Sequence, residues 1–199
     1  MSHRPFHHGN LRAVLLEQAE AVLRERGIDA LSLRELAREA GVSHGAPRSH
    51  FVDRKALLDA LAERGFVRLA DQIREAVSQV PADHARTLHA AASAYLRFAE
   101  RDPALLDLMF ATKADGPPEA VRSAAERLFG VMTGIMDAGV EAGAYDRSDV
   151  GRLTLLLSAT VQGISTLVTS RRITVSQGET LIDDAISVFL RGVSAERHG

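Results

Sequence analysis

Residues 32–55 hold the polar side chains whose types and spacing are best suited to bind a nucleic acid. Serine hydroxyls and free amides at a helix start favour phosphate, and arginine or lysine adds positive charge. We predict phosphate contacts from Ser32, Ser43, His50, Arg54 and Lys55. Contacts to base edges, which carry the sequence information, are predicted from Arg34, His44, Gly45, Ala46 and Arg48, and the same surface includes Ser49.

These roles have structural alternatives. Arg34 could instead form a surface ion pair with Glu35 or Glu39 on its own helix. His50 could pack and hydrogen-bond at a helix end, and residues 54–55 could simply be solvated at a helix start. The residue types alone therefore leave both interpretations open at these positions.

The stretch from residue 31 to residue 51 has the pattern of two short helices joined by a tight turn. Ser32 and Glu35 have the spacing of a capping box. Gly41 stands where a helix end favours positive φ, and Ser43 can cap the next helix. This layout lets a second helix enter a DNA major groove while the first braces it. The same corner also occurs in all-α proteins that never bind DNA.

Helices are predicted on both sides of this corner. Residues 10–26 carry apolar side chains at helical spacing. Asp53 is the predicted N-cap of a long helix that runs to about Val80. Three short helices leading into a long fourth one therefore fill the first part of the chain.

Residues 1–65 resemble the N-terminal domain of the TetR/AcrR family of transcriptional regulators. The resemblance rests on residues whose spacing spans three helices, namely Gly27, Leu31, Ser32, Leu36, Ala37, Ala40, Gly41, Val42, Ser43, His50, Phe51, Lys55 and Leu57. It implies a two-domain helical dimer that binds operator DNA through its N-terminal domain. It also implies a small ligand, bound by the C-terminal domain, that usually releases the DNA.

Two positions depart from the family pattern. Pro47 stands early in the second helix, where the family commonly has an apolar residue such as leucine, and proline disfavours helical geometry at Ala46 before it. Arg48 replaces a tyrosine that usually contacts the phosphate backbone. Because arginine binds phosphate or guanine, DNA contact survives this change while the sequence that is read can differ.

The remaining chain predicts further helices and a dimer. They are expected over 83–100, from Asp102–Pro103 to about 110, over 118–142 and over 153–170, with a loop at 111–118, and the last helix begins at a capping box formed by Ser176 and Glu179. Residues 150–192 form a hairpin whose apolar surface is broader than one packing partner needs, so we expect it to pair with a second copy. Burial of the hairpin within the monomer is the alternative.

The expected fold is all-α, with an N-terminal three-helix helix-turn-helix domain (1–55) joined by a long helix to a C-terminal helical ligand-binding and dimerisation domain (56–199). In the second domain, aromatic and methionine side chains with a few polar groups suit an adaptable pocket for an apolar or amphipathic effector. The predicted effector-binding residues are Tyr95, Phe98, Met109, Phe110, Phe129, Met132, Met136, Gln162 and Thr166. A plain core uses the same residue types, and the two polar residues could instead bond across a dimer.

Composition narrows the function classes. The formal net charge is −2, yet residues 1–55 carry nine Arg or Lys against seven Asp or Glu, hence +2, as a modular DNA binder can. No cysteine, HExxH motif or glycine-rich phosphate loop supports an enzyme, and we expect no cofactor, no catalytic residue and no metal site. No signal peptide is visible and the uncharged stretch 153–170 contains many polar residues, which favours a cytoplasmic protein without a membrane span.

Two questions stay open at this stage. Arg4, His7 and His8, with Arg12 nearby, could form an arm that touches DNA or remain a solvated tail. The competing functions are a helical protein-interaction module and a small-molecule-binding protein without DNA readout. The sequence does not name the operator, the effector or the regulated genes.

Overall fold

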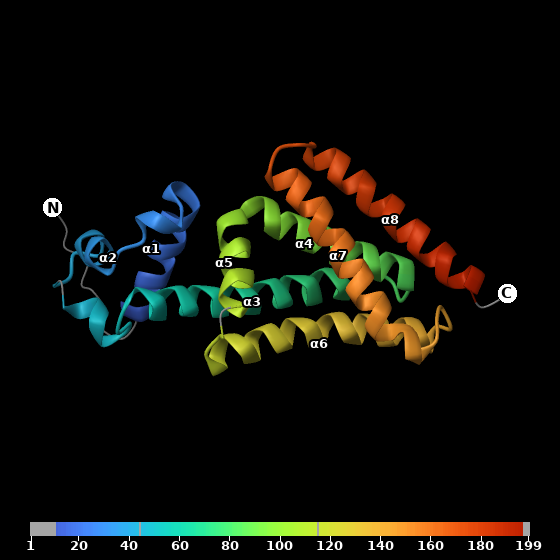
Figure 1. Cartoon of the computed structure of the whole chain (residues 1–199), viewed down its shortest axis with the longest axis horizontal. Helices are drawn as coiled ribbons and strands as arrows, with labels where there is room; N and C mark the ends of the chain where they lie inside the picture. The colour runs from blue at the N-terminus through green and yellow to red at the C-terminus, as the bar shows by residue number, and fades with distance from the viewer. Residues whose placement is uncertain (1–10, 44, 115, 197–199) are drawn as a thin grey trace. The chain divides into compact units, whose positions relative to one another are not determined.

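The computed structural model describes residues 11–43, 45–114 and 116–196, and in these ranges the chain is helical without strands. The predicted all-α class is therefore confirmed, and Figure 1 shows the order of the elements. Their bounds are α1 (Leu11–Arg26), η1 (Ile28–Ala30), α2 (Leu33–Glu39), η2 (Ala46–Ser49), α3 (Arg54–Ser78), α4 (His84–Arg101), α5 (Pro103–Ala114), α6 (Glu119–Glu141), η3 (Arg147–Asp149), α7 (Val150–Thr169) and α8 (Val175–Glu196), where η marks a short 3₁₀ helix.

The chain divides into two compact units. Unit 1 comprises the chain up to Gly65 together with Ala104–Arg122, and unit 2 comprises Phe66–Pro103 together with the chain from Ser123 onward. In unit 1, α1 packs against α2 and η1, and α2 packs against η2. The core of this unit includes Leu15, Leu23, Leu36, Phe51, Leu57 and Leu61, all fully or nearly fully buried.

Unit 2 is built around three helices, because α4 packs against both α7 and α8, and these two also pack on each other. Gly178 permits the close approach of α8 to α7, since a Cβ atom there would lie 2.6 Å from a methyl group of Val168. None of the helices in the described part of the chain has the length and hydropathy needed to span a bilayer. The uncharged stretch within α7 thus belongs to a helix packed in unit 2.

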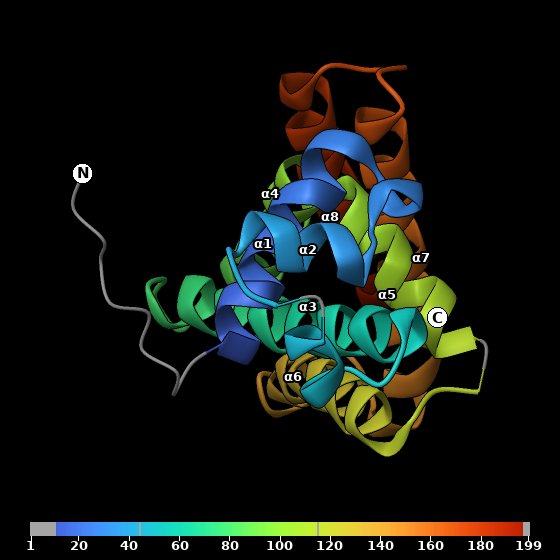
Figure 2. The same ribbon diagram turned by 90° about the vertical axis from the view of Figure 1, so that its left-hand side faces the viewer.

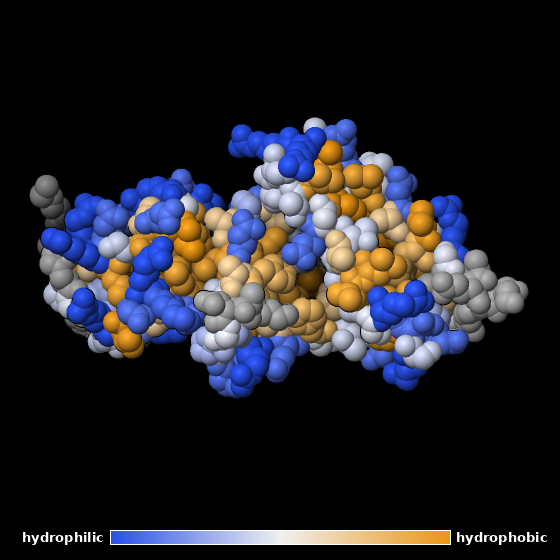
Figure 3. Space-filling model, in the orientation of Figure 1, coloured by the Kyte–Doolittle hydropathy of each residue, from blue (hydrophilic) through white to orange (hydrophobic). Residues whose placement is uncertain are grey.

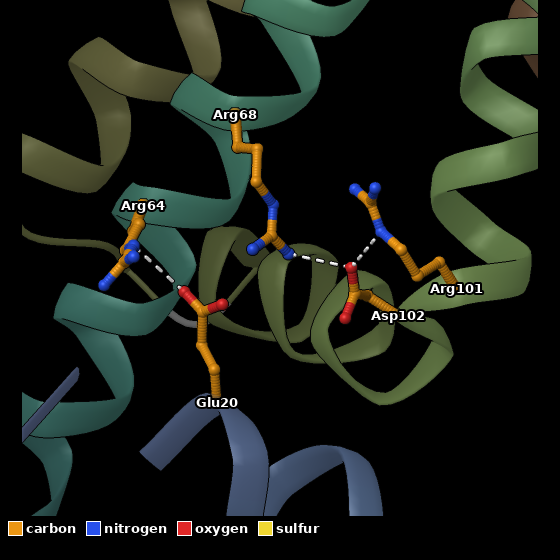
Figure 4. A network of polar contacts seen from close by, with 5 residues as sticks. All are labelled: Glu20, Arg64, Arg68, Arg101 and Asp102. Carbon is orange, nitrogen blue, oxygen red and sulfur yellow. Dashed lines mark hydrogen bonds and ion pairs between the residues drawn. The ribbon is translucent and has the colours of Figure 1, made fainter. Parts of the chain in front are cut away.

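Two buried carboxylates are each neutralised by arginine within their own unit (Figure 4). In unit 1 the carboxylate of Glu20, 8% exposed, lies 3.1 Å from Nε of Arg64. In unit 2 the carboxylate of Asp102, 4% exposed, accepts from Nη2 of Arg68 at 2.9 Å and from Nε of Arg101 at 3.0 Å. Removing one partner of such a pair leaves an uncompensated buried charge, so these contacts fix the local helix packing.

The predicted Asp53 cap is confirmed, and the helix predicted over 83–100 is observed as α4, with Asp83 as its N-cap. The side chain of Asp83 accepts from the amide of Arg86 at 2.8 Å, and Asp53 caps α3 by accepting from the amide of Ala56 at 2.8 Å. The predicted loop at 111–118 was wrong in its first part, because α5 continues to Ala114. Alanine is a strong helix former, and the helix stops only before the breakers Gly116 and Pro117.

Both predicted capping boxes were wrong. Ser32 is the N-cap of α2 but its side chain makes no capping bond, and Glu35 lies 3.8 Å from Arg38 instead. At α8 the reciprocal bonds are formed two residues earlier than predicted from Ser176 and Glu179: Oγ1 of Thr174 accepts from the amide of Gln177 at 3.2 Å, and Oε1 of Gln177 accepts from the amide of Thr174 at 2.9 Å. Helix α8 accordingly begins at residue 175.

Candidate DNA-binding surface

The turn after α2 is closed by a Schellman motif. Gly41 adopts φ +66°, its amide donates to the carbonyl of Arg38 at 3.2 Å, and the amide of Val42 donates to the carbonyl of Ala37 at 3.0 Å. These are the 5→2 and 6→1 bonds that satisfy the last carbonyls of a helix, and they require the left-handed conformation that glycine adopts without strain. The bonds fix the direction in which the chain leaves α2 (Figure 2).

The segment after this turn forms one 3₁₀ turn rather than the predicted α-helix. The amides of Arg48 and His50 donate to carbonyls three residues back, those of Gly45 and Pro47, at 3.1 and 3.0 Å. One glycine and one proline within a short segment disfavour an α-helix, because both residues have poor helix propensity and helix nucleation is costly. The predicted Ser43 cap is wrong too, because the N-cap position is occupied by Gly45, which has no side chain to form a capping bond. Two buried side chains, Pro47 and Phe51, hold this turn on unit 1.

Arg34 and Arg48 are exposed, and neither has a hydrogen-bond or ion-pair partner within the described ranges. The alternative of an ion pair at Arg34 is not observed. Its acidic neighbours are engaged elsewhere, since Glu39 accepts from Arg26 at 2.9 Å and Glu35 pairs with Arg38. Two guanidinium groups therefore remain available to bind an anion or a base edge.

The smaller predicted contact residues surround these arginines in the sequence. Ser43, Gly45, Ser49 and His50 are exposed, whereas Ser32 and Ala46 are half-buried. The hydroxyl of Ser49 donates to the carbonyl of Ala46 at 2.7 Å, which ties it to its own turn. Ser43 and His50 keep polar side-chain atoms at the surface, so they can still contact phosphate.

The two cations at the start of α3 are already engaged. Arg54 donates from Nε to the carbonyl of Leu31 at 3.0 Å and from Nη2 to the carbonyl of Ile28 at 2.6 Å. Lys55 pairs with Asp59 at 3.0 Å along the helix. Arg54 thus braces the connection between α1 and α2, a role that its position in the sequence does not indicate.

Some predicted residues lie outside the described ranges, namely His44 and the arm residues Arg4, His7 and His8. Arg12, the second residue of α1, places its guanidinium 5.4 Å from the centre of the Phe51 ring. Phe51 is 2% exposed and follows the 3₁₀ turn directly. This cation–π contact connects the start of α1 to the residue that directly follows residues 45–50, which we call the reading segment.

The predicted effector-binding residues are distributed over both units. Phe98, Met109 and Met136 have no exposed surface, so they act as core in this conformation. Met109 and Phe110 belong to unit 1, whereas the other seven belong to unit 2. Gln162 and Thr166 are exposed on α7, four residues apart on one helix face.

A groove of about 1020 Å³ lies elsewhere in unit 2, between the end of α3, the start of α4 and α6, and none of the nine predicted effector-binding residues lines it. Next to it, the hydroxyl of Tyr145 donates to the carbonyl of Met136 at 3.0 Å and lies 3.0 Å from Nε2 of His84. Burial raises the pKa of Tyr145 to about 12, and the Asp137 charge adds to this shift. Burial lowers the pKa of His84, against the opposing charge of Asp83.

Comparison with known proteins places these features in a family. Residues 15–61 match the family profile described as bacterial regulatory proteins, tetR family, and residues 88–189 match the profile described as tetracyclin repressor-like, C-terminal domain. The second match alone covers half of the chain. The chain belongs to the TetR family.

Solved structures agree with this assignment. A protein of unknown function from Rhodococcus sp. RHA1 is 40% identical, with a TM-score of 0.86, and the match covers 96% of this chain and 99% of that one. A tetR-family regulatory protein from Rhodococcus RHA1 (21% identity, TM-score 0.69, 93% and 97% covered) and the TetR-family regulator PfmR from Thermus thermophilus (21%, 0.65, 89% and 97%) share the fold. A comparison with curated proteins finds no match.

Membership of the TetR family makes this chain a non-enzymatic, DNA-binding transcriptional regulator with a helix-turn-helix domain. Sequence reasoning missed three polar groove residues, Arg74, His84 and Arg127. The available signal was a pair of glycines, Gly130 and Gly134, one helical turn apart within a predicted helix. Within the described ranges, no cluster of three or more metal-binding side chains is present.

Proposed function

We propose that this TetR-family protein is a ligand-released repressor that binds a palindromic operator as a homodimer. The observation that carries the proposal is the pair of exposed guanidinium groups, Arg34 and Arg48, on the two elements joined by the Gly41 turn. Arg48 is proposed to make the main base contact, and Arg34 is proposed to contact a base edge as well. Ser43 and His50 are proposed to contact phosphate. Regulation of an operator would place the protein in the cytoplasm.

Homodimer formation is supported by apolar side chains exposed on the last two helices. Leu155 is 71% exposed, Leu156 52% and Val188 61%. Figure 3 shows apolar surface over α7 and α8. Gln162 and Thr166 share a face of α7 with Leu155 because they follow it by seven and eleven residues, so we assign them to the dimer contact. A dimer would present two reading segments about 34–36 Å apart, one turn of DNA.

Release by a ligand would be a shift between two conformers. An effector lowers DNA affinity only to the extent that it binds the non-DNA-binding conformer more tightly. Coupling of roughly 1–3 kcal/mol would change the affinity about 5–150-fold. The proposed effector is apolar or amphipathic.

The first experiment selects bound sequences from random double-stranded DNA with the full-length protein. Palindromic selected sites would support the proposal. Affinity for the selected site should fall steeply with salt concentration, because phosphate contacts release counterions. No DNA binding, or binding that does not depend on salt, would favour a protein-interaction module or a ligand-binding protein without DNA readout.

Arg48→Ala tests base readout. It should weaken binding to the selected operator by roughly 1–3 kcal/mol, the value of one good bidentate base contact. Binding to unrelated DNA should change much less, and an equal loss on both DNAs would show that Arg48 contacts phosphate only. Arg86→Ala is the matched control, because Arg86 is exposed on α4 in the other unit.

Leu155→Asp tests the dimer. A charge placed in the proposed contact should give a monomer in sedimentation experiments and should strongly weaken operator binding, while circular dichroism stays unchanged. Ala85→Asp is the control, since Ala85 is exposed in the first turn of α4, where an acidic side chain is tolerated. If the Leu155→Asp protein remains dimeric, the face of α7 that carries Leu155 is not the dimer contact.

A further inference from the structure

The groove in unit 2 has the size and lining of a small-molecule site. Its volume of about 1020 Å³ is at the upper end of the range for ligand pockets. Its apolar wall includes Val77 from α3, Val80 and Pro81 from the following connection, and Val131 and Ile135 from α6. A ligand with an apolar body would therefore bury its surface here.

Two glycines on α6 leave space in the groove because they have no side chain. Gly130 and Gly134 line the groove one turn apart, and a Cβ atom at either position would meet nothing within 4 Å. Glycine inside a helix is less favourable than alanine, so its use needs a reason. On the same helix, close packing explains the glycine at Gly139, because a Cβ atom there would lie 2.5 Å from Nε2 of His84. No packing contact supplies a reason at Gly130 or Gly134, but both leave space in the groove.

Positive charge is available at the groove. Arg127 on α6 is exposed and has no ion-pair or hydrogen-bond partner within the described ranges. Arg74 on α3 pairs only with Asp71 on its own helix, at the surface. The acidic side chain in the lining, Asp83, already accepts from the amide of Arg86 as the N-cap of α4. Asp83 keeps its negative charge next to His84, so among the described residues the charged group that has no partner at the groove is Arg127, and its guanidinium complements an anion.

His84 also lines the groove, and its ring orientation is fixed by Tyr145. The hydroxyl proton of Tyr145 is used on the carbonyl of Met136, so Nε2 of His84 must donate to the Tyr145 oxygen. In the neutral ring, Nδ1 is then an acceptor, and this buried atom has no partner within the described ranges.

We propose that this groove binds an amphipathic carboxylate, with its apolar body along Gly130 and Gly134 and its acid group on Arg127. Ligand binding in the groove can be measured without DNA. Only the effect of that binding on operator affinity rests on the proposed ligand-released function. It gives the effector a location and a charge that the predicted effector-binding residues did not provide.

Calorimetry on the full-length protein, without DNA, tests the proposal with three probes of one chain length: decanoate, decanol and decylamine. Decanoate should bind, decanol should bind at least tenfold more weakly, and decylamine should not bind detectably. Shortening decanoate to octanoate should weaken binding by about fourfold per methylene removed, the factor expected for buried apolar chain. Absence of decanoate binding, or equal binding of the three probes, would overturn the proposal.

Variants locate the probe. Gly134→Leu should abolish decanoate binding by filling the groove, and its circular dichroism should match that of the wild type because the added side chain meets open space. Ala120→Leu, at an exposed position earlier in α6, is the control and should bind decanoate normally. Arg127→Gln should keep decanol binding and lose the preference for decanoate over decanol. Normal decanoate binding by Gly134→Leu, or an unchanged preference in Arg127→Gln, would overturn the assignment.

The two proposals fail separately. Decanoate that binds in the groove without changing operator affinity would leave this site intact and would contradict release of DNA through it. Operator binding that is lost on addition of decanoate in both wild type and Gly134→Leu would place the effector elsewhere and overturn the groove assignment.

Discussion

Gly139→Ala is the sharpest test of the packing in unit 2. A Cβ atom at this position would lie 2.5 Å from Nε2 and 2.6 Å from Cε1 of His84, and closer still to the hydroxyl of Tyr145. Neither ring can move aside easily, because Tyr145 is 2% exposed and is bonded to both His84 and the carbonyl of Met136. The added methyl group must therefore displace α4 or break these hydrogen bonds.

The expected loss follows from three contributions. Overpacking a well-packed core costs about 1–3 kcal/mol, and each hydrogen bond lost adds about 0.5–1.5 kcal/mol. Replacing glycine by alanine in a helix recovers at most about 1 kcal/mol, and less near the C-terminal end of α6, where Gly139 stands. With one hydrogen bond lost, we therefore expect Gly139→Ala to lower the free energy of unfolding by about 1–4 kcal/mol.

The assay is urea unfolding followed by far-ultraviolet circular dichroism, with Gly134→Ala as the matched control. The two substitutions are chemically identical and stand on the same helix, but a Cβ at Gly134 meets open space. Gly134→Ala should therefore raise the free energy of unfolding by up to about 1 kcal/mol. Equal effects of the two substitutions, or a Gly139→Ala protein as stable as the wild type, would refute the reasoning from close approach.

Three further outcomes are expected. Arg54→Ala should destabilise unit 1 by about 1–2 kcal/mol because it removes two hydrogen bonds to backbone carbonyls. If Arg54→Lys has the DNA affinity of the wild type, Arg54 contacts phosphate and does not act by bracing unit 1. Burial lowers the pKa of His84 below 6.5, so the native state binds a proton less readily than the unfolded chain. The free energy of unfolding should therefore fall as pH drops below about 6.5. His84→Gln should reduce that fall, as measured by urea titrations at about pH 7.5 and 5.5. Arg171, at φ 58°, occupies a left-handed C-terminal position that favours glycine, so Arg171→Gly should raise the melting temperature, and a lowered one would contradict this.

The sequence predicted the elements whose signals are local. Asp53, Asp83 and Gly41 each mark one helix end, because the capping bond or the positive φ involves residues within one turn. The start of α8 was missed because two overlapping pairs, at 174 and 177 and at 176 and 179, have the same spacing and similar donors. Spacing alone cannot choose between them.

The groove was beyond sequence reasoning for a different reason. Gly134 and Gly139 are both glycines inside one predicted helix, yet one faces open space and the other meets two rings. His84 is 55 residues away from Gly139 in the sequence, and no periodicity links them. Arg54 shows the same difficulty, since its carbonyl partners follow α1 and precede α2. Roles that depend on distant chain segments need the folded structure.

The reading segment is held by its anchors rather than by helix formation. Its 3₁₀ turn has poor helix propensity, but Pro47 is buried at the front, and Phe51 is buried directly after it beneath the guanidinium of Arg12. Arg48 and His50 lie between these anchors and are exposed. Proline loses little backbone entropy on folding, because its φ is already fixed. The departure from the family pattern at Pro47 is therefore compatible with a rigid reading segment, with Arg48 held beside an anchored residue.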